Sequence, residues 1–177
     1  MKRGVLINVS IVQKMIKRAV IYQLMTNFDE KLKSTEVQLT HRDLSEGTGR
    51  AETWFNNSFR NTEDLQISSF LRILAVANVS HKLKTDTEID GAFLSDIFTS
   101  DVLETASTIN EVAMENDAHF LDSSFIQSKA VLFQDLVTYW GILSANNKLD
   151  ASEEEALREI RAILNSGNNA EQEEDNE

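Results

Sequence analysis

The residues best suited to chemistry in this sequence are two amides and a guanidinium that follow Gly49. Asn56 and Asn57 are adjacent, and Arg60 comes three residues later. An Asn side chain can form two hydrogen bonds with the edge of adenine in the DNA major groove, and an Arg side chain can do the same with guanine. A short helix that exposes these side chains would therefore be suited to reading base pairs.

Helical spacing predicts such a helix over residues 51–59 and divides its side chains between two faces. One face consists of Ala51, Phe55, Ser58 and Phe59. The other face is polar and consists of Glu52, Thr53, Asn56, Asn57 and Arg60. The apolar face would pack inward, which leaves the amides exposed.

Another short helix is predicted just upstream, over residues 41–47. Thr40 can cap its N-terminus, Asp43 occupies the reciprocal position of a capping box, and Leu44 would point inward. Gly49 follows at a point where a tight turn requires a positive φ. Two short helices joined by a glycine turn are typical of a helix-turn-helix, and an ordinary αα-hairpin is the alternative for the same pattern.

Residues 39–80 resemble the helix-turn-helix of the Cro/phage-repressor-like (XRE-type) family. The first block of the family pattern is matched by Leu39, Thr40, Leu44, Thr48 and Gly49. Phe55 takes the buried position of the recognition helix. The last block is matched, without a gap, by Ile67, Phe70, Leu71, Arg72, Ile73, Val79 and Ser80.

Three positions depart from the family pattern: Phe59 stands where Glu is frequent, Asn61 where Gly is usual, and Leu65 where Pro is common. The resemblance implies a sequence-specific DNA-binding transcriptional regulator. It further implies a repressor of phage, plasmid or bacterial origin that acts on operator DNA as a homodimer or homotetramer, because paired recognition helices read two half-sites.

Each polar residue of the motif then has an expected role. The residues expected at base edges are Arg50, Glu52, Thr53, Asn56 and Asn57. The residues expected at phosphates are Thr40, His41, Arg42 and Arg60. The first group would carry sequence preference, and the second would add affinity for any duplex.

Charge is divided unevenly along the chain. Residues 1–85 carry 13 Lys/Arg and 8 Asp/Glu, a net charge of +5, whereas residues 86–177 carry 4 and 21, a net charge of −17. This asymmetry predicts that the first part meets a polyanion. The alternative is that the acidic surface serves only solubility. The cluster of Lys14, Lys17 and Arg18 could likewise touch the DNA backbone or form a solvated face.

Apolar spacing is helical almost throughout and proline is absent, so the sequence predicts an all-α protein. We expect a helix-turn-helix DNA-binding domain over 1–85, a helical oligomerisation bundle over 86–165 and a disordered acidic tail over 166–177. Asp150 and Glu153 predict a capping box at the last helix. The stretch 125–143 is apolar on nearly every side, and its candidate contacts between subunits are Phe125, Leu132, Phe133, Leu136, Tyr139, Trp140 and Leu143.

Other classes of function find little support. The chain has no cysteine, and its histidines (His41, His81 and His119) lie far apart without HExxH spacing, so neither a metal nor another cofactor is expected. No nucleotide-binding or nucleophile-elbow glycine motif occurs, and we expect no enzyme. No segment reads as a membrane span or signal peptide, which favours a cytoplasmic, nucleoid-associated protein. The alternative function is an all-α adaptor or antirepressor that binds a regulatory protein or peptide and no DNA.

Overall fold

The computed structural model describes residues 6–34, 39–60, 67–89, 91–114 and 119–174, and the fold of this part is all-α, as predicted. The helices are α1 (Val9–Lys33), α2 (His41–Gly47), α3 (Trp54–Arg60), α4 (Ile67–Thr85), α5 (Gly91–Ile97), α6 (Ser100–Met114), α7 (Ser123–Ser128), α8 (Ala130–Ala145) and α9 (Ala151–Glu174). Two short strands, β1 (Ile7–Asn8) and β2 (Phe120–Leu121), pair antiparallel with Ile7 opposite Leu121.

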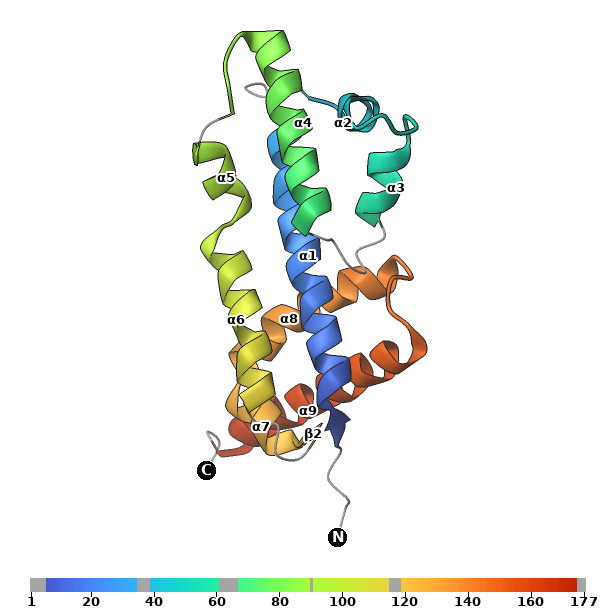
Figure 1. Cartoon of the computed structure of the whole chain (residues 1–177). Helices are drawn as coiled ribbons and strands as arrows, with labels where there is room; N and C mark the ends of the chain where they lie inside the picture. Colours follow the sequence, from blue (N-terminus) through green and yellow to red (C-terminus); the bar gives the residue numbers. More distant parts are fainter. Residues whose placement is uncertain (1–5, 35–38, 61–66, 90, 115–118, 175–177) are drawn as a thin grey trace. The chain divides into compact units, whose positions relative to one another are not determined.

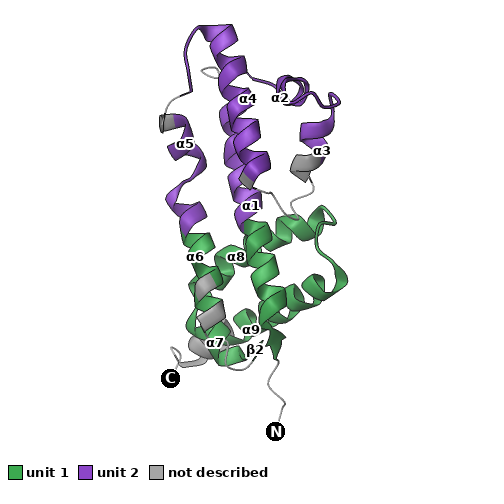
Figure 2. Cartoon of the chain, in the orientation of Figure 1, with its two compact units in different colours: residues 1–19, 104–177 green, residues 20–103 purple. Residues whose placement is uncertain are grey.

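The chain forms two compact units, one of residues 1–19 with 104–177 and one of residues 20–103 (Figure 2). This division differs from the expected boundary at 85/86. The second unit extends past residue 85 because α5 contributes Phe93 and Ile97 to its core. The first part of α1 belongs instead to the other unit, where the indole N–H of Trp140 donates to the carbonyl of Met15 at 2.8 Å.

The unit of residues 20–103 is built around Phe28, which is fully buried on the second part of α1. Its ring meets Phe55 of α3, Phe70 of α4 and Phe93 of α5 at centroid distances of 5.9 to 6.0 Å. In Figure 1, α4 runs alongside this part of α1. Aromatic rings at these distances contribute packing beyond the area that they bury. One side chain thus joins three helices that are remote in sequence.

The other unit buries the apolar stretch that the sequence assigned to contacts between subunits. Phe133, Leu136, Trp140 and Leu143 line the inner face of α8 and are almost completely inaccessible to solvent. Phe125, Leu132 and Tyr139 are half-buried. Four of the seven candidate contacts are therefore core residues of the chain itself, and their burial requires no second copy.

The predicted capping box of the last helix is present in the same unit. The carboxylate of Asp150 accepts from the N–H of Glu153 at 3.0 Å, and the carboxylate of Glu153 accepts from the N–H of Asp150 at 2.8 Å. Glu153 is fully buried and also pairs with Arg18 at 2.8 Å. Lys14 pairs with Asp150 at 2.7 Å. Two cations of the Lys14–Arg18 cluster therefore hold the start of α9 and do not form a basic surface.

The end of α9 corrects a further expectation. The helix runs to Glu174, whereas the sequence predicted a disordered tail from residue 166. A helix that is already formed lengthens at little cost, because each added residue gains one hydrogen bond for the dihedral angles that it fixes.

Among the described residues, no helix combines the length and apolarity that a bilayer crossing requires.

Candidate nucleic-acid interface

The first helix of the motif begins as the sequence predicts. The Thr40 hydroxyl accepts from the N–H of Asp43 at 3.1 Å, and the Asp43 carboxylate accepts from the N–H of Thr40 at 2.8 Å. Lys84 of α4 also donates to Asp43 at 2.8 Å. Burial opposes ionisation of Asp43, but the hydrogen bonds from Lys84 and Thr40 outweigh it and lower its pKa. Leu44 is fully buried, as predicted.

The turn after α2 also follows the prediction. Gly49 has a φ of +71°, a conformation that disfavours side chains. The N–H of Arg50 bonds back to the carbonyl of Ser45 at 3.0 Å. Arg72 of α4 donates to the carbonyl of Thr48 at 3.1 Å. The turn is therefore fixed both by its own backbone and by a side chain from α4.

The second helix begins later than predicted, at Trp54 instead of residue 51. Residues 51–53 lie before this helix, and Thr53 directly precedes it. The segment forms a turn instead, in which the N–H of Trp54 bonds to the carbonyl of Ala51 at 2.8 Å. Glu52 and Thr53 therefore precede α3 and do not lie on it. Figure 1 shows α2 end-on and α3 from the side, so their axes are far from parallel.

Ser45 is a structural residue of the motif that sequence reasoning missed. Its buried hydroxyl accepts from the backbone N–H of Phe55 at 3.0 Å and donates to the carbonyl of His41 at 2.9 Å. Phe55 is itself buried, as predicted. No local pattern marks this serine, because its partner belongs to the next helix.

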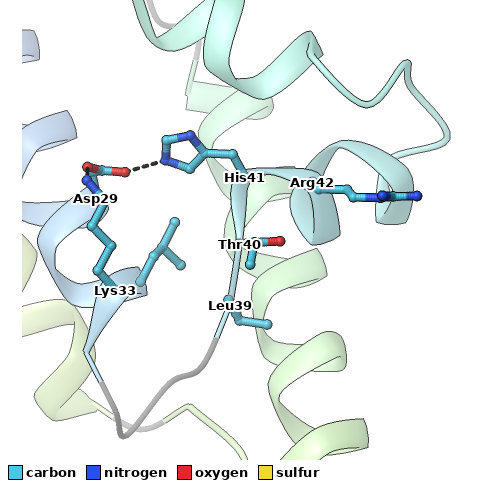
Figure 3. Close-up of a pocket in the computed structure, with 7 residues that line it drawn as sticks. Asp29, Lys33, Leu39, Thr40, His41 and Arg42 are labelled. Atoms are coloured by element: carbon cyan, nitrogen blue, oxygen red, sulfur yellow. Dashed lines mark hydrogen bonds and ion pairs between the residues drawn. The ribbon is translucent and has the colours of Figure 1, made fainter.

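His41 differs most from its expected role. Its ring nitrogen Nε2 is hydrogen-bonded to the carboxylate of Asp29 of α1 (Figure 3). The same ring lies 4.9 Å from the ring of Phe55. Burial opposes ionisation of Asp29, but hydrogen bonds from Lys33 and His41 outweigh it and lower its pKa. The imidazole therefore braces α2 against α1, and its expected contact with a phosphate stays a prediction. A cavity of about 350 Å³ adjoins this pair, lined by Asp29, Leu32, Lys33, Leu39, Thr40, His41 and Arg42.

The residues expected at base edges are largely accessible. Arg50, Glu52, Thr53 and Asn57 are exposed, and Asn56 is half-buried. The guanidinium of Arg50 lies over the ring of Trp54, 5.4 Å from its centroid.

Several positions of the motif lie outside the described part of the structure. Asn61 and Leu65 belong to this group, as do the side chains of Ser58, Phe59, Arg60 and Ile67. The predicted phosphate contact of Arg60 therefore stays a prediction.

Two acidic side chains lie beside Arg42 on this surface. Arg42, expected at a phosphate, is exposed and pairs with Glu46 at 2.8 Å and with Glu52 at 3.5 Å. The unit of residues 20–103 contains 8 Lys/Arg and 13 Asp/Glu, a net charge of −5. The positive balance of residues 1–85 is not the balance of this unit, because five of the 13 cations of residues 1–85 precede residue 20 and the unit adds five acids between residues 86 and 103. The uneven distribution of charge along the sequence therefore does not give a positive net charge to the unit that contains the motif.

Comparisons with known proteins identify no family. No family model, no curated protein and no solved structure matches the chain. Within the described residues, no group of three or more His, Asp or Glu side chains is placed to hold a metal ion.

Proposed function

We propose that the chain binds double-stranded DNA through α2, the Gly49 turn and α3, and that it regulates transcription. The observation that carries the proposal is the way in which α3 is held. Phe55 is buried on one side of α3, whereas Asn57 on the other side is exposed. A short helix that is anchored by a buried aromatic residue and exposes polar side chains is suited to the major groove.

The surrounding helices support this arrangement. Parts of α1, α2, α3, α4 and α5 share one core, and Leu44, Phe55 and Ile73 all contribute to it. The hydrogen bond between Arg72 and Thr48 holds the turn. The hydrogen bond between Ser45 and Phe55 holds α2 and α3 together. A reading helix needs such support because contacts with bases depend on its orientation. The further proposal that the chain is a repressor and acts as a homo-oligomer rests on the resemblance to the XRE-type family alone.

The charges define what DNA binding would require. Glu52 and Glu46 neutralise Arg42, so the exposed ion pairs around it must open before Arg42 can reach a phosphate. Exposed pairs of this kind are weak, about 0–1 kcal/mol each, and can exchange for a phosphate. Glu52 can also accept from the N4 amino group of cytosine. We therefore expect modest affinity for random DNA and a larger contribution from base contacts.

A specific observation favours a second candidate function, a protein-binding adaptor. The net charge of −5 in residues 20–103 repels a polyanion at long range. Binding to a protein partner, in contrast to DNA, does not require positive charge on this unit. In this reading α2 and α3 form an ordinary helical hairpin.

Selection of bound duplexes from a random pool with the full chain separates the two candidates. DNA binding predicts an enriched motif and an affinity that falls as salt rises, with a slope set by the number of phosphates contacted. Asn57→Ala should weaken the selected duplex by about 1–3 kcal/mol and relax one base preference. Asn165→Ala, at an exposed amide of α9, is the matched control and should bind as the parent does.

Glu52→Gln tests the electrostatic part of the proposal. Removing this carboxylate leaves Arg42 with Glu46 alone, so binding to random duplex should tighten about two- to fivefold. Glu155→Gln removes one exposed negative charge from α9 and controls for net charge. The DNA-binding proposal would be removed, and the adaptor favoured, if no motif were enriched and if Glu52→Gln and Glu155→Gln bound random duplex with equal affinity.

A further inference from the structure

Helix α4 is apolar on two opposite sides, and only one of them is covered. Phe70, Ile73 and Ala77 face the core of residues 20–103. On the other side, Leu71, Ala75, Val79 and Leu83 recur every fourth residue, and we name these four the outer row. Helices that are apolar on every side are usually buried on every side.

The outer row is highly accessible. The exposed fractions are 57% for Leu71, 59% for Val79 and 83% for Leu83, and Ala75 is also exposed. Single exposed apolar residues are common on proteins, but four in line on one helix form a contiguous patch. Side chains spaced by four residues make the ridge through which helices most often pack against one another. The shape of the outer row therefore fits another helix.

The charged side chains of α4 are positive, and by helical spacing two of them, Arg72 and Lys82, lie on the side of the outer row. The helix carries Arg72, Lys82 and Lys84 and contains no Asp or Glu, although its unit has a net charge of −5. On the helix surface, Arg72 neighbours Ala75, three residues later, and Lys82 neighbours Val79, three residues earlier. Lys82 pairs with Glu88 at 2.6 Å and Lys84 with Asp43 at 2.8 Å. The Lys82 pair is exposed on both sides, so a partner carboxylate can replace Glu88 at little cost.

We propose that the outer row of α4 docks an amphipathic helix of another protein whose apolar face is bordered by acidic residues. A second copy of α4 fits poorly in either direction. An antiparallel copy centred between Ala75 and Val79 would place its Lys82 beside Arg72, and a parallel copy would place like cations together along its length. The site does not rest on DNA binding, because it uses the side of α4 that faces away from the core.

The test uses the full chain and two synthetic helical peptides of about 18 residues. Both carry leucine every fourth residue, and the positions bordering this row are Glu in one peptide and Lys in the other. Fluorescence anisotropy should show the Glu peptide binding at least about tenfold more tightly than the Lys peptide. Lys82→Glu should reduce the ratio of the affinities for the Glu peptide and the Lys peptide about two- to fivefold, because it reverses one exposed charge.

Val79→Glu places a charge in the middle of the outer row and should weaken the Glu peptide about tenfold or more. Val131→Glu, at an exposed valine of α8, is the matched control and should leave binding unchanged. Equal binding of the two peptides, or no binding of the Glu peptide at 100-fold excess over the chain, overturns the proposal. Sedimentation that shows a dimer dissociated by Val79→Glu also overturns it, because a second copy then occupies the outer row.

Discussion

The hydroxyl of Ser45 lies 3.0 Å from the backbone nitrogen of Phe55, so one buried side chain of α2 binds the first turn of α3. The same hydroxyl donates to the carbonyl of His41 at 2.9 Å. A helix begins with N–H groups that have no partner in the helix itself, and Ser45 supplies an acceptor for one of them, the N–H of Phe55. The geometry of the motif thus depends on a buried residue that is not part of its exposed polar surface.

Ser45→Ala should destabilise the chain by about 1–2 kcal/mol, because it leaves the buried N–H of Phe55 without an acceptor. Urea unfolding measures the loss, and amide hydrogen exchange locates it at Phe55. Ser68→Ala, at an exposed serine of α4, is the control and should change neither quantity. Unchanged protection of the Phe55 amide in Ser45→Ala would contradict this role for the hydroxyl.

Gly49→Ala should also destabilise the turn, by about 1–2 kcal/mol, for a purely conformational reason. The φ of +71° disfavours a Cβ, yet among the described residues no atom beyond Gly49 and its two chain neighbours lies within 4 Å of the position that a Cβ would take. Gly49→Asn should lose clearly less, because Asn tolerates the left-handed region better than Ala does. Comparison of the urea midpoints checks that stability decreases in the order Gly49, Gly49→Asn, Gly49→Ala. A Gly49→Ala variant as stable as the parent would refute the prediction.

Local interactions of the fold could be predicted from the sequence, and remote ones could not. The capping boxes at Thr40 and Asp150 and the turn at Gly49 join residues that are close in the chain. The partners of His41 and Arg18 are Asp29 and Glu153, which no sequence spacing relates to them. A charged residue in a sequence is therefore read as exposed until its remote partner is known.

Apolar patterns present a related difficulty. The pattern of residues 125–143 indicates burial, but it does not distinguish burial within the chain from burial against a second copy. Trp140 illustrates the point, because its buried indole bonds to Met15 at the far end of the sequence. The outer row of α4 shows the reverse case, since its leucines are apolar and yet exposed.

The ion pair of Arg18 and Glu153 gives a prediction for the unit of residues 1–19 and 104–177. Glu153→Gln keeps an oxygen that can accept from the N–H of Asp150 but removes the charge that faces buried Arg18. Breaking one side of a buried pair costs about 3–5 kcal/mol, because the remaining charge stays buried without its partner.

The double variant Arg18→Met with Glu153→Gln should recover part of this loss, since neither charge is then buried. Urea unfolding of both single variants and the double variant measures the coupling between the two sites. Glu155→Gln, at an exposed position of the same helix, controls for the change of net charge. Additive losses in the double variant would show that the two side chains do not act as a pair.

Acid should destabilise the chain through the carboxylate at the start of α9. The hydrogen bond from Lys14, joined by those from Ser152 and the N–H of Glu153, lowers the pKa of Asp150 far below its ordinary value of 3.8. A carboxyl whose pKa is lower when folded contributes stability that is fully present above its unfolded pKa. That stability is lost as the pH falls through the folded pKa.

Asp150→Asn should therefore destabilise the chain at pH 7 and make its stability less dependent on pH below about 4, because one proton fewer is taken up on unfolding. Urea midpoints between pH 7 and pH 2.5 measure this slope for the parent and the variant. Asp135→Asn, at an exposed position of α8, provides the matched control and should keep the parental slope. If both variants keep that slope, Asp150 does not contribute to the acid sensitivity, and its contact with Lys14 is too weak in solution to hold the carboxylate ionised.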